Sequence, residues 1–520
     1  MTAAKRYYVT TPIYYVNDVP HIGHAYTTLA CDVLARFKRL DGFDVRFLTG
    51  TDEHGQKVEK SAAAAGIDPK TFTDKVSQNF RDLADFMNYS HDDFIRTTEE
   101  RHKKSCQAIW ARLMERGEIY LGAYAGWYAV RDEAYYAEGE LSTNAEGKKI
   151  APSGAEVEWV EEPSYFFRLS AWQDRLLTYY EDNPDFILPR TRRNEVLSFV
   201  KGGLDDLSVS RTSFKWGVPV PGDDDHIMYV WLDALTNYIT AAGFPDTDSQ
   251  MYQTYWPADL HMVGKDILRF HAVYWPAFLM AAGLEPPRRV YAHGWWTNEG
   301  QKISKSLGNV ISPHDLVAKY GLDQVRYFML REVPFGNDGD FSHRAMVNRM
   351  NGELANDLGN LAQRVLSMVN KNCDAKIPDV SPTAYTQEDK DLLKAAYDLL
   401  GEVRRLMDIQ AFHEALETIW TVIRAANVYV DHQAPWKLRK EDPDRMNVVL
   451  FTLVEAIRLL ALMVQPFMPD SSGRMLDQLA VAEDKRTFDA FDDAHALRAG
   501  TELPKPEGVF PRFAEDEEPS

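Results

Sequence analysis

The order of strand-like and helix-like segments is the feature that most restricts how this chain can fold. Residues 6–15 are rich in Tyr, Val, Thr and Ile, which favours a strand, and apolar residues at helical spacing follow over 25–37. A second strand is predicted at 44–50 and a third at 94–96, with a helical stretch, 69–86, between them. Alternating strands and helices build a parallel sheet, so we expect an α/β fold.

An insertion interrupts this alternation. From about residue 118 to residue 225 the chain changes to aromatic, strand-like pieces separated by turn signals. The alternation then resumes, with strands predicted at 227–232, 260–263 and 290–295. We therefore expect one Rossmann-like, doubly wound domain that the insertion splits into two halves.

The rear of the chain has a different pattern. After about residue 345 strand signals vanish, and apolar residues recur at helical spacing, as at Leu354, Leu358, Leu361 and Val365. This pattern continues to residue 481 and predicts an all-α helix bundle. The acidic end, 514–520, is expected to stay unpacked.

Composition and charge exclude several classes of protein. The formal net charge of −20 argues against a surface that grips nucleic acid everywhere, although a local basic path remains possible. Cys31, Cys106 and Cys373 are far apart, which indicates neither a disulfide framework nor a thiolate metal site. The chain begins without an apolar signal core, and the apolar stretch 272–284 is too short to cross a membrane. We expect a cytoplasmic protein without membrane contact.

His21 and His24 stand three residues apart, where the first strand gives way to a helix. The free N–H groups of a helix N-terminus favour an anion, and Gly23 allows the backbone to approach it closely. Two imidazoles there can donate hydrogen bonds to an α-phosphoryl transition state and stabilise its charge. Taken alone, the pair fits a chance arrangement on a helix face about as well.

A second polar segment reads Lys302-Ile303-Ser304-Lys305-Ser306. Lys302 and Lys305 have the spacing to flank a pyrophosphate, which Lys binds as a point charge. A single Lys-rich loop is most often an ordinary soluble surface. Its occurrence together with the His pair is much more specific.

The two segments resemble the HIGH and KMSKS signatures of the class I aminoacyl-tRNA synthetases, with Ile303 where that family usually has Met. The resemblance extends over nearly the whole chain, and it is specifically to the methionyl-tRNA synthetase family, in its bacterial type without zinc-ligand cysteines. The stretches that carry it are 11–17 (TPIYYVN), 47–55 (FLTGTDEHG) and 229–235 (YVWLDAL).

The resemblance implies a methionine–tRNA ligase, which forms methionyl-adenylate and pyrophosphate from L-methionine and ATP. It then transfers the methionyl group to the 3′-terminal adenosine of tRNA(Met), both initiator and elongator. His21, His24, Lys302 and Lys305 are the implied catalytic residues, and Mg²⁺ accompanies ATP. The implied parts are catalytic halves at 1–117 and 226–300, a connective domain at 118–225, a KMSKS and stem-contact region at 301–345, and an α-helical anticodon-binding domain at 346–520.

The resemblance also assigns binding residues, one by one. Asp52 would meet the α-ammonium group of methionine, and a buried cation does require a nearby anion. The implied wall of the methionine pocket consists of Ile13, Tyr15, Trp231, Ala234, Leu235, Tyr238, Phe270, His271 and Trp275. The implied ATP contacts are His21, Gly23, His24, Gly264, Asp266, His293, Trp295 and Lys305. Without the resemblance, the aromatic residues would more often be plain core residues.

The resemblance makes two further predictions. Family members with a zinc knuckle have Cys where this chain has Ala129, and Asp132, Glu133 and Glu138 do not replace a thiolate cluster, so we expect a metal-free knuckle. Asn360, Arg364 and Trp436 match positions that meet the CAU anticodon by hydrogen bonding and stacking. Because the bundle ends without an additional dimerising domain, we expect a monomer.

Other functions remain as alternatives. A synthetase for isoleucine, valine or leucine would carry a larger editing insertion, and one for cysteine would bind its substrate through a thiolate-bound zinc. A small nucleotidylyltransferase with a similar His turn would not need the helix bundle. A catalytically silent tRNA-binding relative would not need both signatures and Asp52. Amino-acid-dependent pyrophosphate exchange separates these alternatives.

Overall fold

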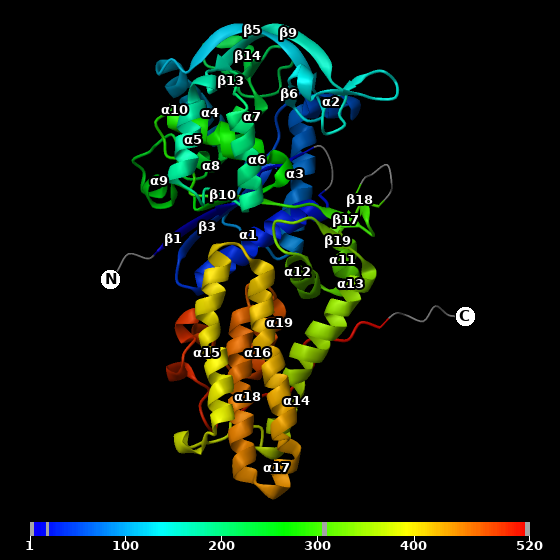
Figure 1. Ribbon diagram of the computed structural model, residues 1–520, viewed down its shortest axis with the longest axis vertical. Helices are drawn as coiled ribbons and strands as arrows, with labels where there is room; N and C mark the ends of the chain where they lie inside the picture. Colours follow the sequence, from blue (N-terminus) through cyan, green and yellow to red (C-terminus); the bar gives the residue numbers. More distant parts are fainter. Residues whose placement is uncertain (1–4, 17–19, 304–308, 515–520) are drawn as a thin grey trace, which may run out of the picture. The chain divides into compact units, whose positions relative to one another are not determined.

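The computed structural model describes residues 5–16, 20–303 and 309–514 (Figure 1). The chain divides into two compact units. The first, here called the sheet unit, contains residues 6–31 and 45–293. The second, the helical unit, contains residues 1–5, 32–44 and 294–520. The predicted α/β class is confirmed. The parallel sheet is formed by the earlier part of the chain, and the later part is helical.

A seven-stranded sheet organises the sheet unit, in the order β10-β16-β15-β1-β3-β2, with β4 also paired to β3. Its strands are β1 (Arg6–Thr10), β2 (Tyr14–Tyr15), β3 (Asp44–Asp52), β4 (Asp93–Arg96), β10 (Ile187–Leu188), β15 (Leu260–Gly264) and β16 (Val290–His293). The pairs β1·β15, β15·β16, β10·β16, β2·β3 and β3·β4 are all parallel. The carboxyl ends of the strands therefore meet at one edge, where doubly wound sheets bind ligands.

The predicted first strand is two strands in the structure. β1 ends at Thr10 and β2 begins at Tyr14, because Pro12 has no backbone N–H to give to a sheet. The predicted strand at 227–232 is wrong. β14 (Asp223–Met228) belongs to a separate antiparallel sheet, and Val230 already begins a helix. A short apolar run such as MYVWLDAL does not distinguish strand from helix by periodicity.

Helices surround this sheet. In chain order they are α1 (Ile22–Leu40, whose residues from Asp32 onward belong to the helical unit), α2 (Gln56–Ala64), α3 (Pro69–Phe86), α4 (Glu100–Glu115), α5 (Gln173–Asp182), α6 (Arg190–Lys201), α7 (Val230–Leu235), α8 (Asn237–Thr240), α9 (Gln250–Tyr255) and α10 (Trp275–Ala281). A π-helical turn, Phe270–Tyr274, precedes α10. α3 begins as its sequence predicts, since Asp68 caps the backbone N–H of Thr71 and Pro69 occupies the first turn.

The inserted region folds as antiparallel strands. A long hairpin pairs β5 (Ile119–Ala129) with β9 (Glu158–Phe167), and β6 (Ala134–Tyr136) and β11 (Leu207–Ser208) extend it on either side. Smaller sheets consist of β7 (Ser142–Thr143) with β8 (Lys149–Ile150), and of β12 (Ser210–Arg211), β13 (Pro219–Val220) and β14.

The helical unit begins with a small sheet of β17 (Trp296–Asn298), β18 (Gln301–Lys302) and β19 (Gly339–Phe341). Its helices are α11 (Pro313–Tyr320), α12 (Leu322–Arg331), α13 (His343–Asn348), α14 (Asn360–Asn372), α15 (Gln387–Asp408), α16 (Phe412–Gln433), α17 (Pro435–Glu441), α18 (Pro443–Val464) and α19 (Pro469–Gln478). A π-helical segment, Arg349–Gly359, leads into α14. In Figure 1, α15, α16 and α18 run side by side. The predicted stripe Leu354, Leu358, Leu361 and Val365 is buried.

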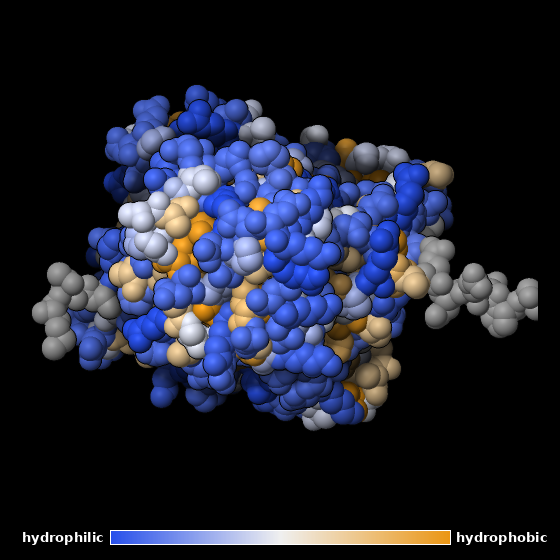
Figure 2. All heavy atoms as spheres, turned by 90° about the horizontal axis from the view of Figure 1, so that it is seen from below, coloured by the Kyte–Doolittle hydropathy of each residue, from blue (hydrophilic) through white to orange (hydrophobic). Residues whose placement is uncertain are grey.

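Helix α18 is the core of this bundle. It is long and apolar enough to cross a membrane, but 89% of its most apolar stretch is buried within the protein. The charged residues in the middle of this helix, Glu455 and Arg458, are buried as a hydrogen-bonded pair at 2.6 Å. The face shown in Figure 2 is mostly hydrophilic, with hydrophobic residues in small scattered groups. The acidic end predicted at 514–520 lies outside the described residues from Glu515 onward.

Candidate active site

The HIGH segment forms the turn into α1. The backbone N–H of Gly23 donates to Nδ1 of His21 at 3.0 Å, and the backbone N–H of His21 donates to Nδ1 of His24 at 3.1 Å. Because each Nδ1 accepts, the proton of a neutral imidazole must be on Nε2. A Cβ atom on Gly23 would lie 2.9 Å from Cε1 of His21, so a larger residue here would displace the His21 ring from this position. Both rings therefore offer an Nε2–H donor, with ring centroids 4.0 Å apart.

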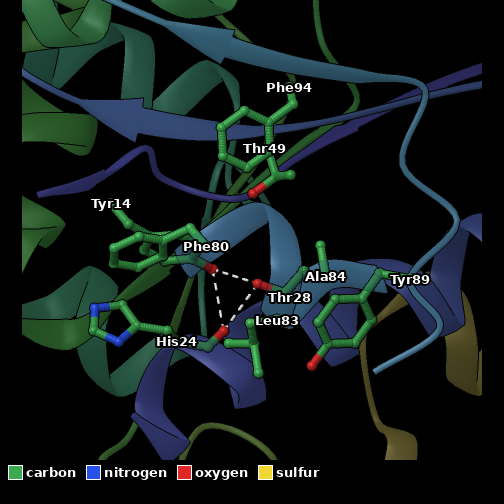
Figure 3. Close-up of a pocket in the computed structure, with 9 residues that line it drawn as sticks. All are labelled: Tyr14, His24, Thr28, Thr49, Phe80, Leu83, Ala84, Tyr89 and Phe94. Atoms are coloured by element: carbon green, nitrogen blue, oxygen red, sulfur yellow. Dashed lines mark hydrogen bonds between the residues drawn. The ribbon is translucent and has the colours of Figure 1, made fainter. Parts of the chain in front are cut away.

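His24 is held in an apolar setting. Its ring lies edge-on to Tyr14 and Phe80, at 4.9 and 5.2 Å between centroids. The Thr28 hydroxyl donates to the His24 carbonyl at 2.9 Å and contacts the Tyr14 hydroxyl at 2.7 Å, beside a small pocket behind the turn (Figure 3). Burial, and then the charge of His21, lower the pKa of His24 well below its ordinary value. His24 is therefore a neutral donor at pH 7.

The ends of β15 and β16 lie at the same edge of the sheet. Gly264 pairs with His293, and a Cβ atom on Gly264 would lie 2.5 Å from Oδ1 of Asp266. The exposed Asp266 carboxylate thus folds back over the end of the strand, into space that a side chain at 264 would occupy. Nε2 of His293 lies 2.7 Å from Oγ1 of Thr27, in the next turn of α1 after the His pair. Burial lowers the pKa of His21 and the charge of Asp266 partly offsets that effect, which places the carboxylate near the His pair.

Asp52 is the last residue of β3, and its side chain is 7% exposed. Its Oδ1 is buried and has no hydrogen-bond partner among the residues that the structure describes. Burial, followed by the charges of Asp233 and Glu133, raises the pKa of Asp52 well above its ordinary range. A bound cation would reverse this shift, because an opposite charge stabilises the ionised form. Oδ1 of Asp52 is thus free to accept a hydrogen bond from a bound cation.

An aromatic cluster follows in α7, α8 and the π-helical turn. Trp231 stacks on Phe270 at 3.7 Å between centroids, with the rings 5° from parallel. Nδ1 of His271 lies 2.9 Å from the carbonyl of Ile267, which can only accept, so Nδ1 carries the proton. Nε2 of His271 therefore accepts from the Tyr238 hydroxyl at 2.7 Å. Burial lowers the pKa of His271 to about 4, so the ring is neutral.

The other residues predicted for methionine lie in the same part of the sheet unit. Ile13, Tyr15, Leu235 and Trp275 belong to one hydrophobic cluster, and Ala234 is buried next to Leu235. The predicted residues of the sheet unit therefore come together around the carboxyl edge of the sheet. Their binding roles stay predictions.

The predicted residues of the helical unit are Trp295, Lys302, Lys305 and the anticodon set. Lys305 and the side chain of Lys302 lie outside the described part of the chain, and Trp295 is 44% exposed. Asn360 is exposed at the start of α14, and Trp436 in α17 is 47% exposed. Arg364 in α14 pairs with Asp431 of α16 at 2.9 Å. An exposed amide and indole, together with a partly buried guanidinium, are groups that can read unpaired bases.

The knuckle region contains a small alanine cluster and a hydrogen-bonded aspartate. Ala129, Ala151 and Ala155 form a small buried cluster, and Asp132 accepts hydrogen bonds from Tyr136, at 3.0 Å, and from Ser153. Among the described residues, the one group with the spacing of a metal site is His102, Cys106 and Asp233, outside the knuckle.

Two acidic residues of the sheet unit were missed as site residues from the sequence. Glu133, at a backbone φ of 46°, accepts from the Tyr15 hydroxyl at 2.5 Å, and burial raises its pKa to about 7. Asp233 is fully buried and bonds both His54 and His102. Asp233 and His54 lie within the quoted stretches 229–235 and 47–55, which was the available signal. The sequence around Glu133 carries no such signal.

Comparison with known proteins identifies the family to which the chain is similar. The family model described as "tRNA synthetases class I (M)" matches residues 7–366, and the one described as "Anticodon binding domain of methionyl tRNA ligase" matches residues 377–520. The methionine–tRNA ligase of Brucella suis is 58% identical over 514 residues, covering 99% of both chains. That of Rickettsia felis is 57% identical over 98% of this chain and 99% of its own.

Solved structures give the same result. The Mycobacterium tuberculosis methionyl-tRNA synthetase in complex with methionyl-adenylate has a TM-score of 0.95 and 54% identity, covering 98% of this chain and 100% of that one. The apo form of that enzyme has a TM-score of 0.90 at 51% identity, covering 99% of each chain. The chain therefore belongs to the methionyl-tRNA synthetase family of class I aminoacyl-tRNA synthetases.

Proposed function

We propose that this member of the family is an ATP-dependent methionine–tRNA ligase, and that the residues assembled at the carboxyl edge of its sheet perform the activation step. The observation that carries this proposal is the buried Oδ1 of Asp52, which has no hydrogen-bond partner among the described residues and whose strand pairs with Tyr15 of the aromatic cluster. An α-amino acid supplies the missing cation, and a thioether suits aromatic ring edges. Sulfur–aromatic contacts of about 0.3–1.5 kcal/mol each favour methionine only modestly, so the ammonium contact provides much of the binding.

In the first step, a carboxylate oxygen of methionine attacks the α-phosphorus of ATP in line, and pyrophosphate leaves. No side-chain nucleophile is needed. His21 and His24 donate from Nε2 to the phosphoryl oxygens as they gain charge, which is possible because both Nδ1 atoms are already occupied by backbone N–H groups. Neither imidazole acts as a general base in this scheme. Asp266 accepts from the ribose hydroxyls, and His293 lies on the adenine side.

Lys305, and secondarily Lys302, neutralise the departing pyrophosphate, and Trp295 contributes to ATP binding. Mg²⁺ enters with ATP as part of the substrate, where it neutralises phosphate charge. In the second step the terminal adenosine hydroxyl of tRNA(Met) attacks the activated carbonyl, and AMP leaves. Asn360, Arg364 and Trp436 read the anticodon through hydrogen bonds and stacking. The exposure of Asn360 on α14 and of Trp436 on α17 supports this role.

We further propose that the knuckle is metal-free and that the protein acts as a cytoplasmic monomer. The support for a metal-free knuckle is that alanine occupies positions 129 and 151 and that the Asp132 carboxylate already accepts side-chain hydrogen bonds from Arg131, Tyr136 and Ser153. A zinc knuckle needs four ligands, mostly thiolates.

Methionine-dependent exchange of labelled pyrophosphate into ATP tests the proposal. We expect exchange with methionine and with none of the other 19 amino acids at equal concentration. His24→Ala should reduce the rate by a factor on the order of 100, because it removes one preorganised donor. Exchange that does not depend on methionine, or equal exchange with isoleucine, valine, leucine or cysteine, would contradict the assignment.

A further inference from the structure

Asp233 is a fully buried carboxylate for which the activation mechanism above has no role. Its Oδ2 lies 2.6 Å from Nδ1 of His54, and its Oδ1 lies 2.7 Å from Nε2 of His102. A carboxylate can only accept, so both imidazoles direct an N–H at it. His102 is 0% exposed and His54 is 2% exposed, so water does not compete for these bonds. Asp233 is therefore clamped between two histidines.

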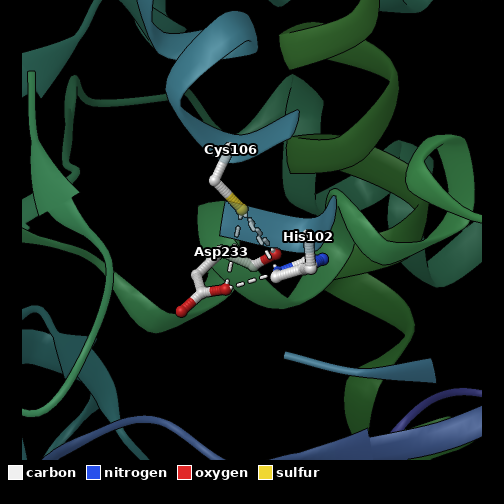
Figure 4. A group of neighbouring side chains, drawn as sticks. All are labelled: His102, Cys106 and Asp233. Atoms are coloured by element: carbon white, nitrogen blue, oxygen red, sulfur yellow. Dashed lines mark hydrogen bonds and ion pairs between the residues drawn. The ribbon is translucent and has the colours of Figure 1, made fainter. Parts of the chain in front are cut away.

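The clamp joins three segments of the sheet unit. Asp233 lies in α7, two residues after Trp231 and immediately before Ala234 and Leu235 of the predicted methionine pocket. His54 lies two residues after Asp52, in the loop that follows β3. His102 comes from α4, whose Cys106 lies 3.2 Å from the same imidazole nitrogen (Figure 4). The Asp233 carboxylate thus connects α7, which carries Trp231, to the loop that follows Asp52.

A metal ion is a poorer explanation of this cluster, although His102, Cys106 and Asp233 have ligand-like spacing. Two ligand atoms about 2.0–2.1 Å from a tetrahedral zinc are about 3.3 Å apart. Nε2 of His102 and Oδ1 of Asp233 are 2.7 Å apart, which is a hydrogen-bond length. Burial, and then the charge of Asp233, raise the pKa of the Cys106 thiol well above its ordinary value, so the Cys106 side chain is a thiol beside this hydrogen-bonded pair.

The charge of Asp233 is compatible with its burial. Burial alone would raise its pKa, but the positive charge of His54 and hydrogen bonds from His102 and His54 outweigh this and hold the pKa below its ordinary value. The carboxylate is therefore ionised at pH 7. A buried ion that keeps both partners is stable, whereas removing one partner leaves an uncompensated charge.

We propose that Asp233 is a positioning residue for methionine, which holds the Asp52 loop and the Trp231 helix in the register that lets both face one amino acid. The inference rests on the proposed function. Within the described residues, the Asp233 carboxylate forms its hydrogen bonds with His54, His102 and Cys106. The effect of the clamp therefore falls on the amino acid and not on ATP.

Pyrophosphate exchange with methionine and ATP varied separately tests this role. Asp233→Asn keeps the shape but aims an amide N–H at one of the two imidazoles, so we expect the KM for methionine to rise about ten-fold or more. That corresponds to about 1.4 kcal/mol, the loss of a hydrogen bond to a charged group. The KM for ATP should change by less than about two-fold, on the same argument.

A pair of variants at His54 gives a test that does not depend on Asp233→Asn folding. In His54→Asn the amide nitrogen replaces Nδ1 and can still donate to Asp233, whereas His54→Leu cannot. We expect His54→Leu to raise the KM for methionine as Asp233→Asn does, and His54→Asn to recover most of that loss. His226→Leu is the matched control, because His226 is also buried and hydrogen-bonded, to Ser210 at 2.8 Å, in the same unit. It should leave the KM for methionine unchanged.

Equal rises in both KM values, or His54→Asn behaving like His54→Leu, would overturn the inference. So would a fall in kcat with the KM for methionine unchanged. Absence of methionine-dependent exchange in the unmodified protein would instead reject the proposed function. The two failures are therefore distinguishable.

Discussion

Replacing Asp52 with Asn should lower activity and raise stability at the same time. In the absence of substrate, Asp52 is 7% exposed, and its Oδ1 has no partner among the described residues. Its environment adds the negative charges of Asp233 and Glu133. The ionised group is therefore unfavourable in the free protein and favourable only when an ammonium group binds.

The loss of activity follows from the missing charge. A hydrogen bond to a charged group contributes about 1.5–3 kcal/mol, and leaving one member of a buried ion pair alone costs about 3–5 kcal/mol. Asn keeps an acceptor oxygen, so we take about 3 kcal/mol, which is on the order of a 100-fold loss in kcat/KM for methionine. The KM for ATP should change little.

The gain in stability follows from the raised pKa of Asp52. A carboxyl group whose folded-state pKa is raised contributes stability at low pH, and this contribution is lost as the pH rises through the folded-state pKa. At pH 7.5 the folded protein therefore carries a penalty that Asn removes. We expect the melting temperature of the free protein to rise by about 1–3 °C, for a gain of about 1 kcal/mol.

Exchange kinetics at saturating ATP and thermal unfolding without ligands measure the two effects on the same preparations. Asp68→Asn is a suitable control for the change of residue type, since Asp68 caps α3 away from the site; it should keep full activity and change stability little, because Asn caps a helix about as well as Asp does. A lower melting temperature for Asp52→Asn would refute the reasoning, because it would mean that Asp52 has a structural partner. Unchanged kcat/KM for methionine would refute it as well.

Three further predictions test other parts of the account. Because burial lowers the pKa of His271 to about 4, the unfolded chain takes up this proton first, so the free energy of unfolding should fall as the pH drops from about 6.5 to 4. His271→Gln should show a shallower fall in urea titrations, and an unchanged slope would contradict the assigned burial effect. Metal analysis of the purified protein should find no stoichiometric zinc, and one zinc per chain would reject the metal-free knuckle. Trp436→Ala should reduce tRNA charging by about ten-fold or more, since stacking contributes about 1–3 kcal/mol per base. It should leave pyrophosphate exchange intact, and an equal loss of exchange would show that the helix bundle had been disturbed.

The fold could be predicted largely because its strands and helices differ in period and length. β15 and β16 follow long helical or polar stretches and begin at the predicted residues, 260 and 290. The error at 227–232 arose where neither criterion applies: the run is short, apolar throughout, and contains both the end of β14 and the start of α7. Burial on all sides removes the periodicity on which such predictions depend.

The residues of the candidate site could be predicted only where they belong to a short sequence motif. His21 and His24 act as a local unit, and their tautomers depend on backbone N–H groups within three residues, so the chain itself defines that geometry. The clamp around Asp233 joins residues separated by 179 and 131 positions, and no local pattern predicts such contacts. His102 has a sequence context typical of an exposed, charged helix. Its complete burial is visible only once α4 is packed.

Charging of tRNA tests the central claim most directly. The purified protein would be incubated with methionine, ATP and Mg²⁺, together with either tRNA(Met) carrying the CAU anticodon or the same tRNA with that anticodon replaced. The account predicts a methionyl ester on the 3′-terminal adenosine of the first tRNA, with release of AMP and pyrophosphate, and little or none on the second. Methionine-dependent exchange without any charging, or equal charging of both tRNAs, would contradict it.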